Sequence, residues 1–121
     1  MRAQMRILVV EDEDLIAAEI AAILRRAGYI VVGTVGSAEQ VIAFLTKTPC
    51  DFAVVDANLA GSSTAPVATA LKRRTIPFVV VSGYAQRELL LPLRDAPFVP
   101  KPIDDAALLA ALASLQANAA E

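Results

Sequence analysis

The chain alternates between short apolar runs and longer stretches in which apolar residues recur every three or four positions. The short runs are rich in Val, Ile and Phe and are bounded by turn residues, which is typical of strands buried on both faces of a parallel sheet. They comprise residues 7–10, 29–35, 52–55, 78–81 and 98–99. The pattern therefore predicts five strands.

Helices are predicted between and after these strands. The first has Asp14 as its expected N-cap, one apolar stripe that includes Ile20 and Leu24, and Gly28 as its stop. The second begins with a capping box formed by Ser37 and Gln40.

Three further segments complete the helical pattern. A helix over 64–74 follows a loop predicted over 58–63, and an Ala-rich last helix is capped by Asp104 or Asp105. Pro92 and its neighbouring leucines predict a short or distorted fourth helix over 86–95 that leaves leucine surface exposed.

Strand–helix alternation with short connections predicts an α/β fold in which a (βα)5 parallel sheet is covered on both faces, a three-layer sandwich. A length of 121 residues is that of one ordinary domain. We therefore expect a single domain over 1–121 with its core at about 5–117.

Composition narrows the classes of function. The chain has no histidine and one cysteine, Cys50, which excludes a His-based triad, a His-ligated zinc site and a disulfide framework. A net charge of −2 without a large basic cluster argues against direct nucleic-acid binding. No apolar run reaches the roughly 20 residues of a membrane span, and the first run is too short for a signal peptide. We expect a soluble, cytoplasmic protein.

Acidic residues follow two of the strands. Glu11 and Asp12 come directly after the first strand, and Asp56 ends the third. Since the carboxyl ends of parallel strands open into one crevice, the three carboxylates should crowd together and repel one another by about 4 kcal/mol per pair. A cation between them relieves this repulsion, and an all-oxygen donor set favours Mg²⁺. Glu13 and Asp14 can instead be explained as acids that complement the helix dipole.

A hydroxyl and an ammonium are expected at the same edge. Ser82 ends the fourth strand and Lys101 follows the fifth. Each alone can be a turn or surface residue, but together with the acids they fit in-line phosphoryl transfer onto a carboxylate. In that reaction Asp56 is the nucleophile, while Ser82 and Lys101 meet the phosphoryl oxygens.

The motifs at these strand ends resemble those of response-regulator receiver domains of bacterial two-component signalling, the family of the chemotaxis receiver. The segments that carry the resemblance are Leu8-Val9-Val10-Glu11-Asp12, Val54-Val55-Asp56-Ala57-Asn58-Leu59, Val81-Ser82-Gly83-Tyr84 and Pro100-Lys101-Pro102. Together they span almost the whole chain.

The resemblance implies a flavodoxin-like sheet of order 2-1-3-4-5 and transfer of phosphate to Asp56 from the phosphohistidine of a sensor histidine kinase or phosphotransfer protein. It also implies direct Mg²⁺ ligation by Asp12 and Asp56, ligation through water by Glu11, and ligation by the backbone carbonyl of Asn58. The Lys101–Pro102 peptide is expected to be cis. Such a chain is not an enzyme in the usual sense, since it catalyses only its own phosphorylation and autodephosphorylation.

Output is then expected through a surface that an unknown downstream protein reads, or through a homodimer. Candidates on the fourth helix, fifth strand and last helix are Leu90, Leu93 and Phe98, with Tyr84 at the mouth of the site. Phe98 stands where the family often has tyrosine. The leucines can alternatively fill the core.

Rival interpretations come from other classes. A haloacid-dehalogenase-type hydrolase needs a second acid two residues after its nucleophile, and Asn58 stands there. A nucleotide-binding module needs a glycine-rich loop after a strand, which this chain lacks. A flavin-mononucleotide binder conflicts with acids where its phosphate must sit. A degenerate receiver, which binds partners without phosphorylation, remains the open alternative.

Overall fold

The computed structural model of the chain describes residues 4–59, 62–83, 93 and 95–119. The candidates Tyr84 and Leu90, and the helix predicted over 86–95 except for Leu93 and Asp95, lie outside the described residues.

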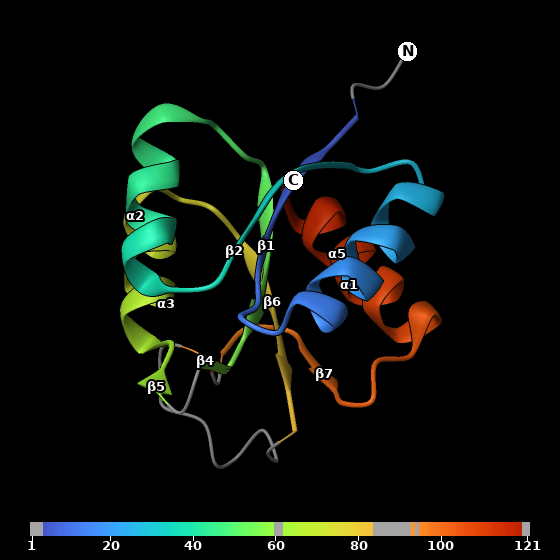
Figure 1. The fold of residues 1–121 in the computed structure, drawn as a ribbon. Coiled ribbons are helices and arrows are strands. Elements are labelled where there is room, and N and C mark those ends of the chain that lie inside the picture. The colour runs from blue at the N-terminus through green and yellow to red at the C-terminus, as the bar shows by residue number, and fades with distance from the viewer. Residues whose placement is uncertain (1–3, 60–61, 84–92, 94, 120–121) are drawn as a thin grey trace.

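A five-stranded parallel sheet forms the centre of the molecule (Figure 1). Its strands lie in the order β2-β1-β3-β6-β7. Counted within this sheet alone, that is the expected order 2-1-3-4-5, so the predicted flavodoxin-like topology is confirmed. The strands are β1 (Arg6–Val10), β2 (Ile30–Val35), β3 (Phe52–Asp56), β6 (Phe78–Ser82) and β7 (Phe98–Pro100).

The segment after β3 differs from the prediction of a plain loop. Two short strands, β4 (Asn58–Leu59) and β5 (Ser62–Ser63), pair antiparallel as a separate two-stranded sheet. Backbone pairing of this kind satisfies polar groups that a reversing chain otherwise leaves unbonded, and Leu59 is buried there.

Helices cover both faces of the sheet, as Figure 1 shows. The helices α2 (Ala38–Lys47) and α3 (Ala65–Arg73) lie on one face, and α1 (Asp14–Arg26) and α5 (Asp105–Ala119) lie on the other. Each face has its own apolar cluster. One includes Val41, Val67 and Leu71 of α2 and α3, and the other includes Leu24 and Leu112 of α1 and α5. The three-layer architecture is therefore confirmed.

The helix starts agree with the sequence except at α1. Asp14 is the first helical residue rather than the cap; the N-cap is Glu13, whose side chain makes no capping bond. In the preceding segment the Glu13 N–H donates to a carboxylate oxygen of Glu11 at 3.2 Å. In α2 the Ser37 hydroxyl accepts from the Gln40 N–H, as predicted. Asp104 caps α5 by accepting from the N–H of its third residue, at 2.9 Å.

The last turn of α1 ends at a glycine, as predicted. Gly28 has φ +94°, and the Tyr29 N–H donates to the Leu24 carbonyl at 3.0 Å. This is the Schellman arrangement, in which the residue after the C-cap takes a left-handed conformation.

The end of α3 has the same arrangement without a glycine. The Ile76 N–H donates to the Leu71 carbonyl at 2.9 Å, and the left-handed position between them is Thr75, with φ +56°. A β-branched residue is rare in this conformation, so the α3 terminus holds local strain.

Within the described part of the chain, none of the helices has the length and apolar character needed to cross a membrane.

Candidate functional site

Three carboxylates meet at the carboxyl ends of β1 and β3. One oxygen from each of Glu11, Asp12 and Asp56 lies within 4.8 Å of the others. The position of Glu11 is fixed by its backbone N–H, which donates to the Val35 carbonyl at the end of β2. The side chains of Glu11 and Asp56 are almost fully buried, while Asp12 is more exposed. The predicted crowding of acids is thus present.

Lys101 bridges two of these acids from the end of β7. Its ammonium lies 3.2 Å from Glu11 Oε1 and 3.0 Å from Asp56 Oδ2. Burial acts to lower the pKa of Lys101, but the hydrogen bond and charge of Asp56 and the charge of Glu11 outweigh it and raise the pKa. The Lys101–Pro102 peptide is cis, as expected. One ammonium thus pairs with two of the three carboxylates.

Among the three acids, Glu11 has a clearly raised pKa. Burial, followed by its hydrogen bond with Asp56, raises the pKa of Glu11 from 4.5 to about 7. The Glu13 N–H and the charge of Lys101 act in the opposite direction but do not cancel the effect. Without a further cation, the site therefore tends to take up a proton near neutral pH.

Asp56 is held from two sides. The Asn58 N–H donates to Asp56 Oδ1 at 3.0 Å, and Lys101 occupies Oδ2. Both carboxylate oxygens keep a further lone pair for another partner. Ligation by the Asn58 carbonyl stays a prediction.

Ser82 lies at the same edge, one residue beyond the point where β6 pairs with Asp56. It is buried, and its carbonyl accepts from the Lys101 N–H at 2.9 Å. The hydroxyl and the ammonium predicted to act together are therefore carried by neighbouring strand ends that are hydrogen-bonded to each other.

The donor set fits Mg²⁺. It consists of carboxylate oxygens only, and with three carboxylates and one ammonium it carries a net negative charge that a cation would balance. Glu11, Asp12 and Asp56 are the residues that could hold the ion.

The predicted output face is only partly described. Leu93 is 2% exposed and belongs to the apolar cluster beneath α2 and α3, so its expected exposure is wrong and the core-filling alternative holds. Phe98 is half-buried against the same cluster.

The sequence did not indicate that residues from β2 and from the start of α2 line a cavity next to the acids. A cavity of about 410 Å³ beside the acids is lined by Thr34, Ser37 and Gln40 as well as by Glu11 and Asp12. The signal was available, since β2 ends at the same edge as β1, but no charged residue marks that end.

Comparison with known proteins agrees with this geometry. The family model for the response regulator receiver domain matches residues 7–113. The transcriptional regulatory protein PdtaR of Mycobacterium tuberculosis is 30% identical over 92 residues, which are 75% of this chain and 45% of PdtaR. The chain thus spans less than half the length of that relative.

Solved structures give the same result. SdrG from Sphingomonas melonis Fr1 is 37% identical with a TM-score of 0.82, over 96% of this chain and 99% of SdrG. The response regulator PhyR from Brucella abortus is 29% identical with a TM-score of 0.79, over 92% of this chain and 47% of PhyR. With a family model that covers most of its length, this chain belongs to the response regulator receiver domains.

Proposed function

We propose that the chain is a working phosphoacceptor receiver in a two-component or phosphorelay system, with Asp56 as the residue that is phosphorylated. The observation that carries the proposal is the cluster of Glu11, Asp12 and Asp56 with Lys101 bridging two of them. A domain that only binds partners has no need for three crowded acids, which repel one another in the absence of a cation.

The proposed step is an in-line displacement at phosphorus. An oxygen of Asp56 forms the new P–O bond while the P–N bond of a phosphohistidine breaks, and the imidazole leaves with the electron pair and takes up a proton from solvent. The carboxylate attacks in its ionised form, so the protein does not have to supply a general base. This agrees with a chain that contains no histidine.

The surrounding groups position the reactants and balance charge. Glu11, Asp12, Asp56 and the Asn58 carbonyl would hold Mg²⁺, which when bound neutralises charge on the acids and on the phosphoryl oxygens. Lys101 already contacts Asp56 and remains beside any group added to it. The Lys101 ammonium and the Ser82 hydroxyl would each meet a phosphoryl oxygen.

The output would be a change in partner binding rather than a further reaction. Phosphorylation adds charge and strong hydrogen-bond acceptors beside Ser82 and Lys101. Because their strand ends are hydrogen-bonded, a shift at one reaches the other and the nearby surface of β7. The donor would be a sensor histidine kinase or a phosphotransfer protein in the cytoplasm, and the reader a downstream protein or a second copy of the chain.

Intact-mass spectrometry tests the proposal directly. The protein is incubated with Mg²⁺ and acetyl phosphate, beside Asp56→Asn and the control Asp95→Asn, which changes an exposed acid at the other end of the sheet. We expect one phosphoryl adduct in the wild type and in the control, dependent on Mg²⁺ and absent from Asp56→Asn. A relative of this chain, SdrG, has a BeF3-activated conformation, which makes BeF3 a useful second probe.

The competing function is that of a degenerate receiver. It predicts no adduct under any of these conditions and no effect of BeF3, while partner binding stays intact in Asp56→Asn. That combination would overturn the proposal.

A further inference from the structure

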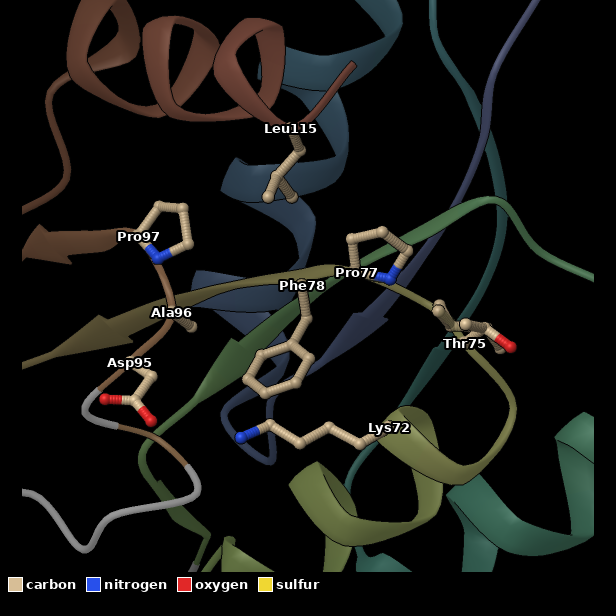
Figure 2. Close-up of a pocket in the computed structure, with 9 residues that line it drawn as sticks. Lys72, Thr75, Pro77, Phe78, Asp95, Ala96, Pro97 and Leu115 are labelled. Carbon is tan, nitrogen blue, oxygen red and sulfur yellow. The ribbon is translucent and has the colours of Figure 1, made fainter. Parts of the chain in front are cut away.

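A second cavity lies far from the acids, at the amino ends of β6 and β7 (Figure 2). Its volume is about 340 Å³, within the range of pockets that hold small molecules. The lining comes from the end of α3, the start of β6, the segment before β7 and the last part of α5. Four separate parts of the chain thus converge on it.

The floor of the cavity is apolar, and its two prolines offer no backbone donor. It includes Pro77, Phe78, Pro97 and Leu115, and proline has no N–H. The carbonyls of the two prolines are already occupied, since they accept from backbone N–H groups at 3.1 Å and 2.8 Å. An apolar body therefore fits this floor better than a polar one.

Two opposite charges stand at the rim. Lys72 and Asp95 are both exposed and both line the cavity. Figure 2 shows the ammonium end of Lys72 directed toward the side on which Asp95 lies. Among the described residues, however, neither side chain takes part in an ion pair. Both charges are therefore available to a ligand.

The strained Thr75 lies on the lining of the same cavity. The equivalent position of α1 has Gly28, which takes a left-handed conformation without the steric penalty that a β-branched residue meets there. Strained residues of this kind gather at functional sites more often than elsewhere. Here the strained residue forms part of the cavity lining.

We propose that this cavity binds a small zwitterion with an apolar body, the chemical class of the apolar α-amino acids. The carboxylate of the ligand pairs with Lys72, its ammonium pairs with Asp95, and its apolar side chain lies on Phe78. An apolar anion would face Asp95 and an apolar cation would face Lys72, so a ligand that carries both charges complements the rim best. The site is independent of the phosphoacceptor function.

L-Phenylalanine is a suitable probe, followed by the backbone amide signals of the ¹⁵N-labelled protein. We expect saturable shifts at Phe78, Ala96 and Leu115 with millimolar affinity, as is usual for a ligand of this size. Removing one charge from the ligand, as in 3-phenylpropionate or phenethylamine, should weaken binding about 1.5-fold to fivefold, the range for exposed ion pairs. Glycine, which lacks the apolar body, should not bind.

Matched variants test the rim residues. Lys72→Gln and Asp95→Asn should each weaken binding of L-phenylalanine about 1.5-fold to fivefold. Lys47→Gln, which removes an exposed lysine from the end of α2, should leave it unchanged. Asp56→Asn should also bind normally, which separates this site from the phosphoacceptor site.

Three results would overturn the proposal. The first is the absence of saturable shifts at the cavity. The second is equal binding of the two singly charged analogues and L-phenylalanine. The third is a set of shifts at these residues that depends on protein concentration alone, which would assign the surface to contact between two copies of the chain.

Discussion

The substitution Glu11→Gln should stabilise the metal-free protein at neutral and alkaline pH. Glu11 is fully buried among acids, and its pKa is raised to about 7 by burial and by Asp56. Above that pH the folded chain must carry a buried charge that the unfolded chain carries in water. Glutamine keeps an oxygen for the Glu13 N–H and removes the charge.

The magnitude follows from the difference between the folded and ordinary pKa of Glu11, about 7 against 4.5. Because the folded pKa is the higher one, the folded chain binds more protons than the unfolded chain between these values. The stability that this provides is fully present below about pH 4.5 and is lost as the pH rises through 7. The full difference corresponds to at most about 3 kcal/mol. The Glu11→Gln variant also loses the ion pair with Lys101. We therefore expect a net gain in the free energy of unfolding of about 1–2 kcal/mol for the variant.

Urea unfolding in the presence of EDTA measures this effect. The free energy of unfolding of wild type and Glu11→Gln is compared from about pH 4.5 to pH 8, with Glu39→Gln, an exposed acid of α2, as the control. The curves should meet at low pH and separate as the pH rises, while the control follows the wild type. A difference between variant and wild type that is the same at every pH, or a destabilised variant at pH 8, would refute the reasoning.

Further predictions concern the metal, the helix ends and the core. Mg²⁺ at ten times its dissociation constant should raise the free energy of unfolding by about 1.4 kcal/mol, seen as a thermal shift that Asp56→Asn largely loses; an equal shift in both proteins would count against the acid cluster as the Mg²⁺ site. Thr75→Gly should stabilise the fold by about 0.5–1 kcal/mol, because glycine adopts the left-handed backbone without strain, and Gly28→Ala should destabilise it by about 1 kcal/mol. Urea unfolding of both variants measures these changes, and a destabilised Thr75→Gly or a stabilised Gly28→Ala would contradict the prediction. Leu112→Ala, at a fully buried position of α5, should cost about 2–5 kcal/mol, and a smaller loss would mean that the cluster collapses around the gap.

The sheet and the acid cluster could be predicted from the sequence because both depend on local patterns. Each buried strand is a short apolar run followed by a polar residue, and parallel pairing places all such residues at one edge. The positions of Glu11, Asp56 and Lys101 follow from that rule alone. Gly28 was predictable for a similar reason, since few other residues end a helix in a left-handed conformation.

Features that depend on tertiary contacts could not be predicted in this way. The pairing of Asn58 with Ser63 joins two strands of only two residues each, which are too short to leave a periodic signal. Thr75 gives no sequence indication of a left-handed backbone, which accompanies the hydrogen bond from the Ile76 N–H to the Leu71 carbonyl at the end of α3. Leu93 was expected at the surface because its neighbours are also leucines, and only the packed structure shows that it fills the core.

The division of the apolar interior by the sheet has a consequence for how such a chain can diverge. The cluster beneath α2 and α3 and the cluster beneath α1 and α5 consist of different residues, so substitutions such as Leu71→Ala and Leu112→Ala should act additively on stability. The acids and Lys101 belong to strand ends and the turns after them rather than to either helical layer. Substitutions selected for binding to a new partner can therefore accumulate in one pair of helices, while the other pair and the acid cluster stay unchanged.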